Sequence, residues 1–539
     1  MAPGGTMDPA LAAQQGEAAE PIQLGALSVD VLVAIMAALP TVEDVGRVDC
    51  TCRAFHRADE PAASRSPVEQ ALRLRAAAAG NVLPDSLPEG ESSWTQRLCW
   101  DERRLRYGER AVVASGMYHS VFVEGDGQLL TCGNARLDGG RPGLLGHGEA
   151  TERLEVPRPV AALASVRVRT VAAAEYHSLA ISECGAAFSW GYGGLGRLGH
   201  GDTHDQYTPR EILLPRAARH GAPPSRVRLC AAAAGSCHTL LLSADAAEPA
   251  YTFGYGGSGR LGHGAEADDA CELSPRAVVA LRGVPLRAVA AGAYHTLALA
   301  ACGDLYSCGE GGLGQLGHGD EGNEPVPRRV EALRRLGERV TAIAAGRLHS
   351  LCVTDSGALY SWGEGDGGRL GHGRTESTCV PQRVLGLASR RVCALSCVWD
   401  HCLALSDGGF VYSWGVGLCG QLGHGDEQDN VDAPRQVAAL AETRVVAVAA
   451  GAHSGFAVSA DGTLHGWGIG KTTENETVDT LGLQLERNAC VPMAYPGGLR
   501  LSRPALVRRI TSSPPSSPPS PAAPHASAPP RLHSPASVL

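Results

Sequence analysis

The sequence predicts a mainly β fold, namely one closed seven-bladed β-propeller of tandem repeats preceded by a small helical region. The first observation behind this prediction is internal repetition, because seven copies of a unit of about 52 to 61 residues follow one another. The second is composition, since glycine is abundant at 68 residues whereas Phe, Trp and Tyr make up only 5%. Short strands joined by glycine turns fit this composition better than long helices.

Three landmarks recur in the same order in the units. The first is a strand of small residues ending in Gly-x-x-His-Ser/Thr, with Ala174 and Val398 replacing the glycine in two copies. The second is an aromatic residue or Cys before Gly, and the third is Leu-Gly-His-Gly followed by a proline. The histidines of the first landmark are His119, His177, His238, His295, His349 and His401. Those of the third landmark are His147, His200, His263, His318, His372 and His424.

The residues between the first two landmarks predict a β-hairpin. In the fifth copy, residues 350–354 and 358–362 alternate in character and flank a turn at residues 355–357. One such unit cannot bury its apolar face alone, so neighbouring units must supply the other half of each interface. Ring closure would protect the two ends that an open stack exposes.

The seventh copy departs from the pattern. Ser454 stands in the histidine position, and residues 481–484 read Leu-Gly-Leu-Gln where Leu-Gly-His-Gly is expected. We interpret this copy as the closing blade. We expect it to be completed by a strand from near the start of the array or from residues 494–510.

The order Gly-x-x-His-Ser, Trp-Gly and Leu-Gly-His-Gly followed by Pro resembles the regulator of chromosome condensation repeat family. The resemblance covers about residues 110–500, with six nearly complete copies. It implies a seven-bladed propeller of four-stranded blades, which agrees with the periodicity and adds the strand number.

A helical pattern precedes the repeats. Apolar residues at helical spacing end at a proline and resume beyond it, which predicts two short amphipathic helices. The segment resembles an F-box, the module that docks on the Skp-type adaptor of SCF-type ubiquitin ligases, although Ser28 and Phe55 replace its usual proline and tryptophan. The adaptor-binding residues that this resemblance implies are Leu27, Leu32, Ile35, Leu39, Pro40 and Val45. The alternative is a helical hairpin that only packs on the propeller.

The expected organisation therefore has five parts. Residues 1–21 are a disordered N-terminus, residues 22–58 the F-box-like hairpin and residues 59–109 a helical linker or brace. Residues 110–510 form the propeller. Residues 511–539 are a Pro/Ser-rich tail whose composition cannot offset the entropy of ordering, so we expect disorder.

Charge and cysteine content exclude several classes of protein. The net charge is −9 and the N-terminus lacks a basic run, so binding to nucleic-acid phosphates is not expected. The 17 cysteines are odd in number and scattered, which is typical of reduced thiols in an intracellular protein. No apolar run approaches the roughly 18 residues of a membrane helix. We expect a monomer in the cytosol, the nucleus or both.

The histidines and cysteines do not predict a catalytic or metal site. One histidine of each kind per blade would be spread around a ring, and we expect each imidazole to bridge strands inside or between blades. Cys393, Cys397, His401 and Cys402 form the one local cluster with ligand-like spacing, but Cys397 and Cys402 fit strand positions and no Cys-x-x-Cys pair is present. We expect no catalytic residue, metal or cofactor.

The leading functional hypothesis is a non-catalytic adaptor, in which the F-box-like segment binds a Skp-type adaptor and a propeller face binds a target protein. The second follows from the family resemblance, which implies guanine-nucleotide exchange on a Ran-like small GTPase. That activity would need a protruding β-wedge and a basic tail, and neither is recognisable in the sequence. A plain interaction scaffold is the third.

Overall fold

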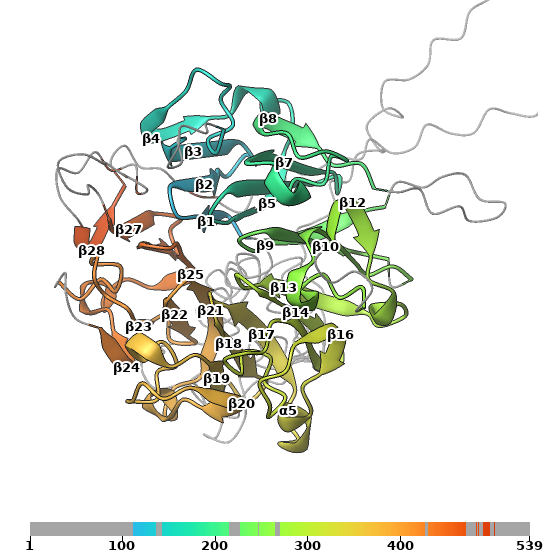
Figure 1. Ribbon diagram of the computed structural model, residues 1–539. Coiled ribbons are helices and arrows are strands. Elements are labelled where there is room, and N and C mark those ends of the chain that lie inside the picture. The colour runs from blue at the N-terminus through green and yellow to red at the C-terminus, as the bar shows by residue number, and fades with distance from the viewer. Residues whose placement is uncertain are drawn as a thin grey trace, which may run out of the picture. The chain divides into compact units, whose positions relative to one another are not determined.

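The computed structural model describes residues 111–135, 143–214, 227–245, 247–264, 270–425, 430–469, 481, 483, 489–495 and 501. Within these residues, seven four-stranded antiparallel sheets follow one another around a common centre (Figure 1). The predicted seven-bladed β-propeller is therefore confirmed. The F-box-like segment at residues 22–58, the brace at 59–109 and the tail at 511–539 lie outside the described residues.

Each blade is a meander of four consecutive strands. Blade one consists of β1 (Val113–Ser115), β2 (His119–Val123), β3 (Leu129–Asn134) and β4 (Arg153–Pro159). Blade two consists of β5 (Val168–Ala173), β6 (His177–Ser182), β7 (Ala187–Gly191) and β8 (Gln206–Glu211). Blade three consists of β9 (Leu229–Ala234), β10 (His238–Ser243), β11 (Ala250–Tyr255) and β12 (Cys271–Ala277). Blade four consists of β13 (Leu286–Ala291), β14 (His295–Ala300), β15 (Leu305–Gly309) and β16 (Glu324–Arg329).

The remaining blades repeat the same order. Blade five consists of β17 (Val340–Ala345), β18 (His349–Thr354), β19 (Leu359–Gly363) and β20 (Thr378–Arg383). Blade six consists of β21 (Val392–Val398), β22 (His401–Ser406), β23 (Val411–Gly415) and β24 (Val431–Gln436). Blade seven consists of β25 (Val445–Ala450), β26 (Ser454–Ser459), β27 (Leu464–Gly468) and β28 (Ala489–Ala494).

The described helices are short and lie in the connections. They are η3 (Ala161–Leu163), η4 (Gly194–Gly196), η5 (Gly257–Gly259), η7 (Val279–Leu281), α5 (Glu331–Arg335), η8 (Asp366–Gly368), η9 (Leu385–Leu387) and η10 (Ala438–Leu440). Those that follow a fourth strand each bury one leucine, such as Leu387 in η9. Among the described residues, no helix is long and apolar enough to cross a membrane.

Burial follows the position of each strand in its blade. The first strands lie nearest the centre of the ring (Figure 1), and β17 there consists largely of small residues. The second strands are buried along their whole length, as in β18. The fourth strands, such as β20, contain half-buried and exposed residues and form the outer rim. The core thus lies between blades, around the second and third strands.

Two kinds of glycine fix the tight turns. Gly191 after Trp190 has a φ of +110°, and a Cβ there would lie 2.7 Å from the backbone oxygen of Tyr176. Gly346 begins Gly-x-x-His, and a Cβ there would lie 2.2 Å from the ring of His349. Both positions therefore need glycine, the first for its backbone angle and the second because the histidine ring fills the space.

The ring closes without exchange of a strand. β28 completes blade seven from within its own repeat, so the expected closing strand from the start of the array or from residues 494–510 was wrong. Side chains seal the junction instead: the ring of Phe122 in blade one lies 5.9 Å from Phe456 and 5.8 Å from Tyr495 in blade seven, both edge to face. The backbone N–H of Ala452 also donates to the oxygen of Gly116 at 3.2 Å.

Candidate interaction face

The six histidines of the first landmark lie at blade junctions. Nε2 of His177 is 2.8 Å from Oγ1 of Thr239 in the next blade, and that hydroxyl donates to the backbone oxygen of Arg197 at 2.8 Å. Because the hydroxyl proton is used in this second bond, the imidazole must donate and therefore carries its proton on Nε2. Equivalent bonds join His119 to Ser178, His238 to Thr296 and His295 to Ser350.

Burial keeps five of these imidazoles neutral, those of His119, His177, His238, His295 and His401. It lowers the pKa of His119, His295 and His401 to about 3. The pKa of His177 and His238 is held well below 6.5, first by burial and then by a nearby arginine. A charge at these positions would lack water, so the neutral form is the one that fits the folded state.

The six histidines of the third landmark bond within their own blade. Nε2 of His372 is 3.1 Å from Oγ of Ser361, whose hydroxyl also contacts the backbone oxygen of Leu370 at 2.6 Å. The bond fastens the long turn after the third strand back onto that strand. The equivalent pairs are His147–Thr131, His200–Ser189, His263–Thr252, His318–Ser307 and His424–Ser413.

Blade seven lacks both bonds. Gly455 stands where the other blades have Ser, Thr or Cys, so Nε2 of His401 has no side-chain partner among the described residues and faces the backbone of Ser454. Gly466 likewise replaces the third-strand hydroxyl in the blade that lacks Leu-Gly-His-Gly. Blade seven thus lacks both the histidine of the third landmark and the third-strand hydroxyl to which that histidine bonds in the other blades.

One face of the propeller carries both histidine loops. In an antiparallel meander, the loop after the first strand and the loop after the third strand lie at the same end of the blade. The first loop precedes the histidine of Gly-x-x-His, and the second carries the glycine run before Leu-Gly-His-Gly. We call this surface the histidine-loop face.

A buried arginine connects blades two and three on this face. The guanidinium of Arg197 lies 5.2 Å from the ring centre of Tyr176 and 4.7 Å from that of Tyr192. It donates to the backbone oxygens of Gly194 at 2.9 Å and Ser236 at 2.6 Å. With only 2% of Arg197 exposed, carbonyls and aromatic faces replace water around its charge.

Blades three and four repeat the arrangement. The guanidinium of Arg260 lies 5.0 Å from the ring centre of Tyr255 and 5.2 Å from that of Tyr294. It donates to the backbone oxygens of Gly257 at 2.7 Å and Ala293 at 3.4 Å. The buried cation holds two half-buried tyrosines in fixed positions.

Trp399 has an unusual backbone at the tip of blade six. Val398 pairs with His401, so Trp399 and Asp400 form a two-residue hairpin turn in which Trp399 has a φ of +56°. Its ring lies 5.1 Å from the guanidinium of Arg347 in blade five and 6.1 Å from the ring of His453 in blade seven. A bulky residue in the left-handed region is strained, and such strain concentrates at functional sites.

These groups form an arc over six of the blades, from blade two to blade seven. The aromatic–arginine arc consists of Tyr176, Tyr192, Arg197, Tyr255, Arg260, Tyr294, Arg347, Trp399 and His453. Beside it, Arg369 forms ion pairs with Glu364 and with Asp400, the latter at 2.9 Å. The sequence prediction missed the arc, although aromatic residues before His and arginines before Leu-Gly-His-Gly are visible as differences between copies.

The structure regroups the cysteine cluster singled out in the sequence. Cys397 and Cys402 face each other on β21 and β22, but the histidine beside them is His349 of blade five rather than His401. Cys393 instead donates to the backbone oxygen of Leu405 at 3.2 Å. The cluster thus lies between two blades and joins residues that are about fifty positions apart.

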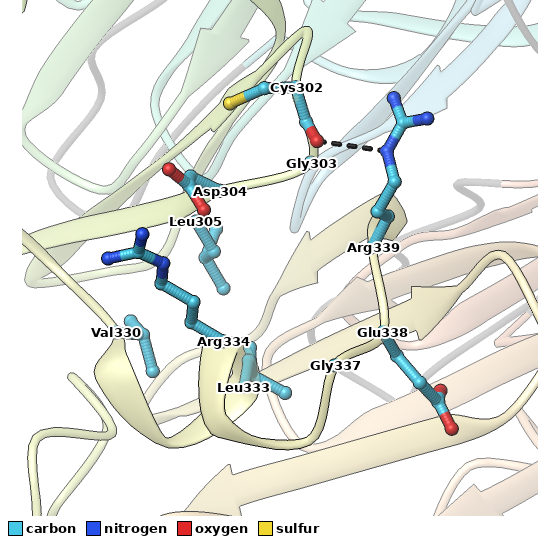
Figure 2. Close-up of a pocket in the computed structure, with 10 residues that line it drawn as sticks. All are labelled: Cys302, Gly303, Asp304, Leu305, Val330, Leu333, Arg334, Gly337, Glu338 and Arg339. Carbon is cyan, nitrogen blue, oxygen red and sulfur yellow. Dashed lines mark hydrogen bonds between the residues drawn. The ribbon is translucent and has the colours of Figure 1, made fainter.

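The opposite face has a small depression under blade four. It is lined by the loop from Cys302 to Asp304 and by residues of and after α5 (Figure 2), with Nε of Arg339 donating to the oxygen of Cys302 at 2.9 Å. Its volume of about 180 Å³ is below the roughly 300 Å³ at which small-molecule sites begin. It is therefore a weak candidate for a ligand site.

The adaptor-binding residues expected in the F-box-like segment are not among those that the structure describes. These residues are Leu27, Leu32, Ile35, Leu39, Pro40 and Val45. Their role stays a prediction.

Family models match most of the repeat array. A model described as "RCC1-like domain" matches residues 249–503, and one described as "Regulator of chromosome condensation (RCC1) repeat" matches residues 126–181 and 185–242. Together they cover nearly all of the described blades.

Several named proteins are similar to the chain. The ultraviolet-B receptor UVR8 of Arabidopsis thaliana is 35% identical over 373 residues, which are 68% of this chain and 79% of that protein. The E3 ubiquitin-protein ligase HERC2 of Homo sapiens is 35% identical over 368 residues, 65% of this chain but 7% of HERC2. Among solved structures, Prp20p of Saccharomyces cerevisiae matches with a TM-score of 0.56 and 22% identity, covering 73% of this chain and 89% of Prp20p.

Proposed function

Because the chain belongs to the family of proteins built from RCC1 repeats, we propose that it is a non-catalytic protein-interaction module whose histidine-loop face binds a target protein. The aromatic–arginine arc carries this proposal. Trp, Tyr and Arg are the residues that dominate binding energy at protein interfaces. Here they are held in place by cation–π contacts and backbone hydrogen bonds, so little side-chain freedom remains to be lost on binding.

The finer part of the proposal is a link to a ubiquitin ligase. The F-box-like segment, through Leu27, Leu32, Ile35, Leu39, Pro40 and Val45, would bind a Skp-type adaptor while the propeller holds the target. The order of a helical hairpin followed by a propeller supports this, as does a relative, HERC2, that is described as an E3 ubiquitin-protein ligase. For this role the protein would be a monomer located in the cytosol, the nucleus or both.

Substitution in the arc is expected to abolish target binding without unfolding the ring. Trp399→Ala combined with Tyr294→Ala removes two half-buried rings from the histidine-loop face. Affinity purification from the native cell followed by mass spectrometry should show a set of partners lost by this variant. The matched control is Leu385→Ala on the opposite face, where Leu385 is 73% exposed. Equal partner sets for the wild type and both variants would contradict the assignment of this face.

The ligase link predicts a separate result. The full chain should capture a Skp-type adaptor in a pull-down, and Leu32→Asp with Ile35→Asp should lose it, because charges at apolar helix positions prevent burial against a partner. The arc variant should still bind the adaptor. Failure of the intact protein to bind would end the ligase proposal and leave a plain scaffold.

Nucleotide exchange is the alternative function. Prp20p, which shares the fold, is described as binding Gsp1p and histones. Release of labelled GDP from a Ran-like GTPase, stimulated at catalytic concentrations of the chain, would replace the adaptor proposal by exchange. Unchanged release would support the adaptor.

A further inference from the structure

The junction of blades five and six contains a buried cluster of two thiols and one imidazole. Nε2 of His349 lies 2.9 Å from Sγ of Cys397 and 3.2 Å from Sγ of Cys402, and the two sulfurs are 3.2 Å apart. His349 and Cys402 are fully buried, and Cys397 is 6% exposed. Three soft or borderline donor atoms therefore converge in a space closed to solvent.

The fold brings the same three positions together at its other junctions. At the junction of blades four and five they hold His295, Ala345 and Ser350, and only the histidine and the hydroxyl are bonded, at 2.8 Å. At the junction of blades seven and one they hold three serines, with Ser115 bridging Ser120 at 2.9 Å and Ser454 at 3.2 Å. Among the seven junctions only that of blades five and six combines two cysteines with a histidine at these positions.

We infer that His349, Cys397 and Cys402 bind a zinc ion that joins blade five to blade six. Thiolate and imidazole are the ligands that Zn²⁺ prefers. Two thiolates, one neutral imidazole and Zn²⁺ sum to zero charge, which suits a buried site. Bonds of about 2.3 Å to sulfur need the two sulfurs about 3.8 Å apart, so from their present 3.2 Å they would separate by about 0.6 Å on binding.

Within the described part of the chain, no cationic side chain hydrogen-bonds the three ligand atoms. Arg369 contacts Glu364 and Asp400 through its guanidinium, and only its backbone oxygen meets the cluster, at 3.5 Å from Sγ of Cys402. Asp400 lies on the turn between the two cysteines. The sequence did not predict this set of ligands, because the histidine comes from a different blade. Metal-binding motifs are recognised by ligands that lie close together in the sequence.

Metal content of the full-length protein tests this inference independently of any binding partner. Protein purified without chelator is expected to hold one zinc per chain by plasma mass spectrometry. Co²⁺ in its place should give thiolate-to-metal charge-transfer absorption. Cys397→Ala with Cys402→Ser should lose both signals, and it should fold because it reproduces the residues of the neighbouring junction, Ala345 and Ser350. Cys393→Ala, which removes a thiol of the same strand outside the cluster, should keep both.

Zinc should also raise the thermal midpoint of the wild type and of Cys393→Ala but not that of the double variant, since a ligand bound only by the folded state stabilises it. The inference is overturned if the folded wild type holds no zinc and gives no cobalt absorption. It is equally overturned if intact-mass and peptide analysis find a Cys397–Cys402 disulfide in metal-free protein. Copper in place of zinc would keep the three ligands and overturn the identity of the ion.

Discussion

Lowering the pH from 7 to 5 is expected to remove most of the propeller's stability. Five fully buried histidines, namely His119, His177, His238, His295 and His401, have a pKa of about 3 or well below 6.5 in the folded protein. In the unfolded chain each has a pKa of about 6.5, so below that value the unfolded state binds more protons. Their contribution to stability is therefore complete above pH 6.5 and is lost as the pH falls toward 3. By pH 5 the loss is about 2 kcal/mol for each, against a usual total of about 5 to 15 kcal/mol.

Urea unfolding at pH 8, 7, 6 and 5 measures this loss, because carboxylates titrate mainly below this range. His295→Gln serves as the control: its amide can still donate to the Ser350 hydroxyl but binds no proton. The unfolding free energy of that variant should fall less steeply with decreasing pH. Its slope should correspond to one proton fewer taken up on unfolding. A midpoint that does not change between pH 7 and pH 5 would show that the buried histidines are already accommodated as cations.

The number and order of blades could be predicted because each copy carries its own signals. Gly-x-x-His, Trp-Gly and Leu-Gly-His-Gly fix turns within about fifty residues, and local signals of this kind determine the meander. The closing of the ring could not be predicted in the same way. Its outer strand β28 is built from the seventh repeat, and the contacts of Phe122 with Phe456 and Tyr495 join the two ends of the array.

The hydrogen-bond partners of the first-landmark histidines could not be predicted from the repeat pattern. In blades two to five the residue after the first-landmark histidine is visible as Ser or Thr in the sequence, but it bonds to the histidine of the preceding blade. That pairing depends on the lateral offset between neighbouring sheets, which one repeat does not encode. Blade seven supports the pairing, because Gly455 leaves His401 without a hydroxyl.

The arc and the thiol cluster escaped prediction for a related reason. A repeat pattern is what the copies share, whereas both sites consist of residues in which the copies differ. Arg197 and Arg260 occupy a position that holds Gln315 in blade four, and Cys402 occupies one that holds Ser350 in blade five. Function in such a ring lies in these differences, which only the assembled blades bring together.

Replacement of Trp362 by alanine is expected to cost about 3 to 5 kcal/mol of unfolding free energy, the usual range for a buried large aromatic residue. Trp362 is fully buried, and its Nε1 donates across the blade junction to the backbone oxygen of Gln315 at 2.9 Å. The indole also packs on Gly317 so closely that a Cβ there would lie 2.7 Å from Nε1. No side chain on the facing glycine can move in to fill the space, so the cavity remains.

The variant Trp362→Phe separates the two contributions of Trp362 to stability, namely the volume of its side chain and its hydrogen bond. Phenylalanine keeps most of the ring, and the oxygen of Gln315 still accepts a bond from Oγ of Ser350 at 2.8 Å, so a cost of about 1 to 2 kcal/mol is expected. Trp399→Ala is the matched surface control, with an expected cost under about 1 kcal/mol because Trp399 is only half-buried and its positive φ is strained in any case. Urea unfolding of the three variants gives the comparison. If Trp362→Ala and Trp399→Ala cost the same, the indoles of the Trp-Gly landmark do not hold neighbouring blades together, and the stability of the ring must reside in the histidine bonds and the second strands instead.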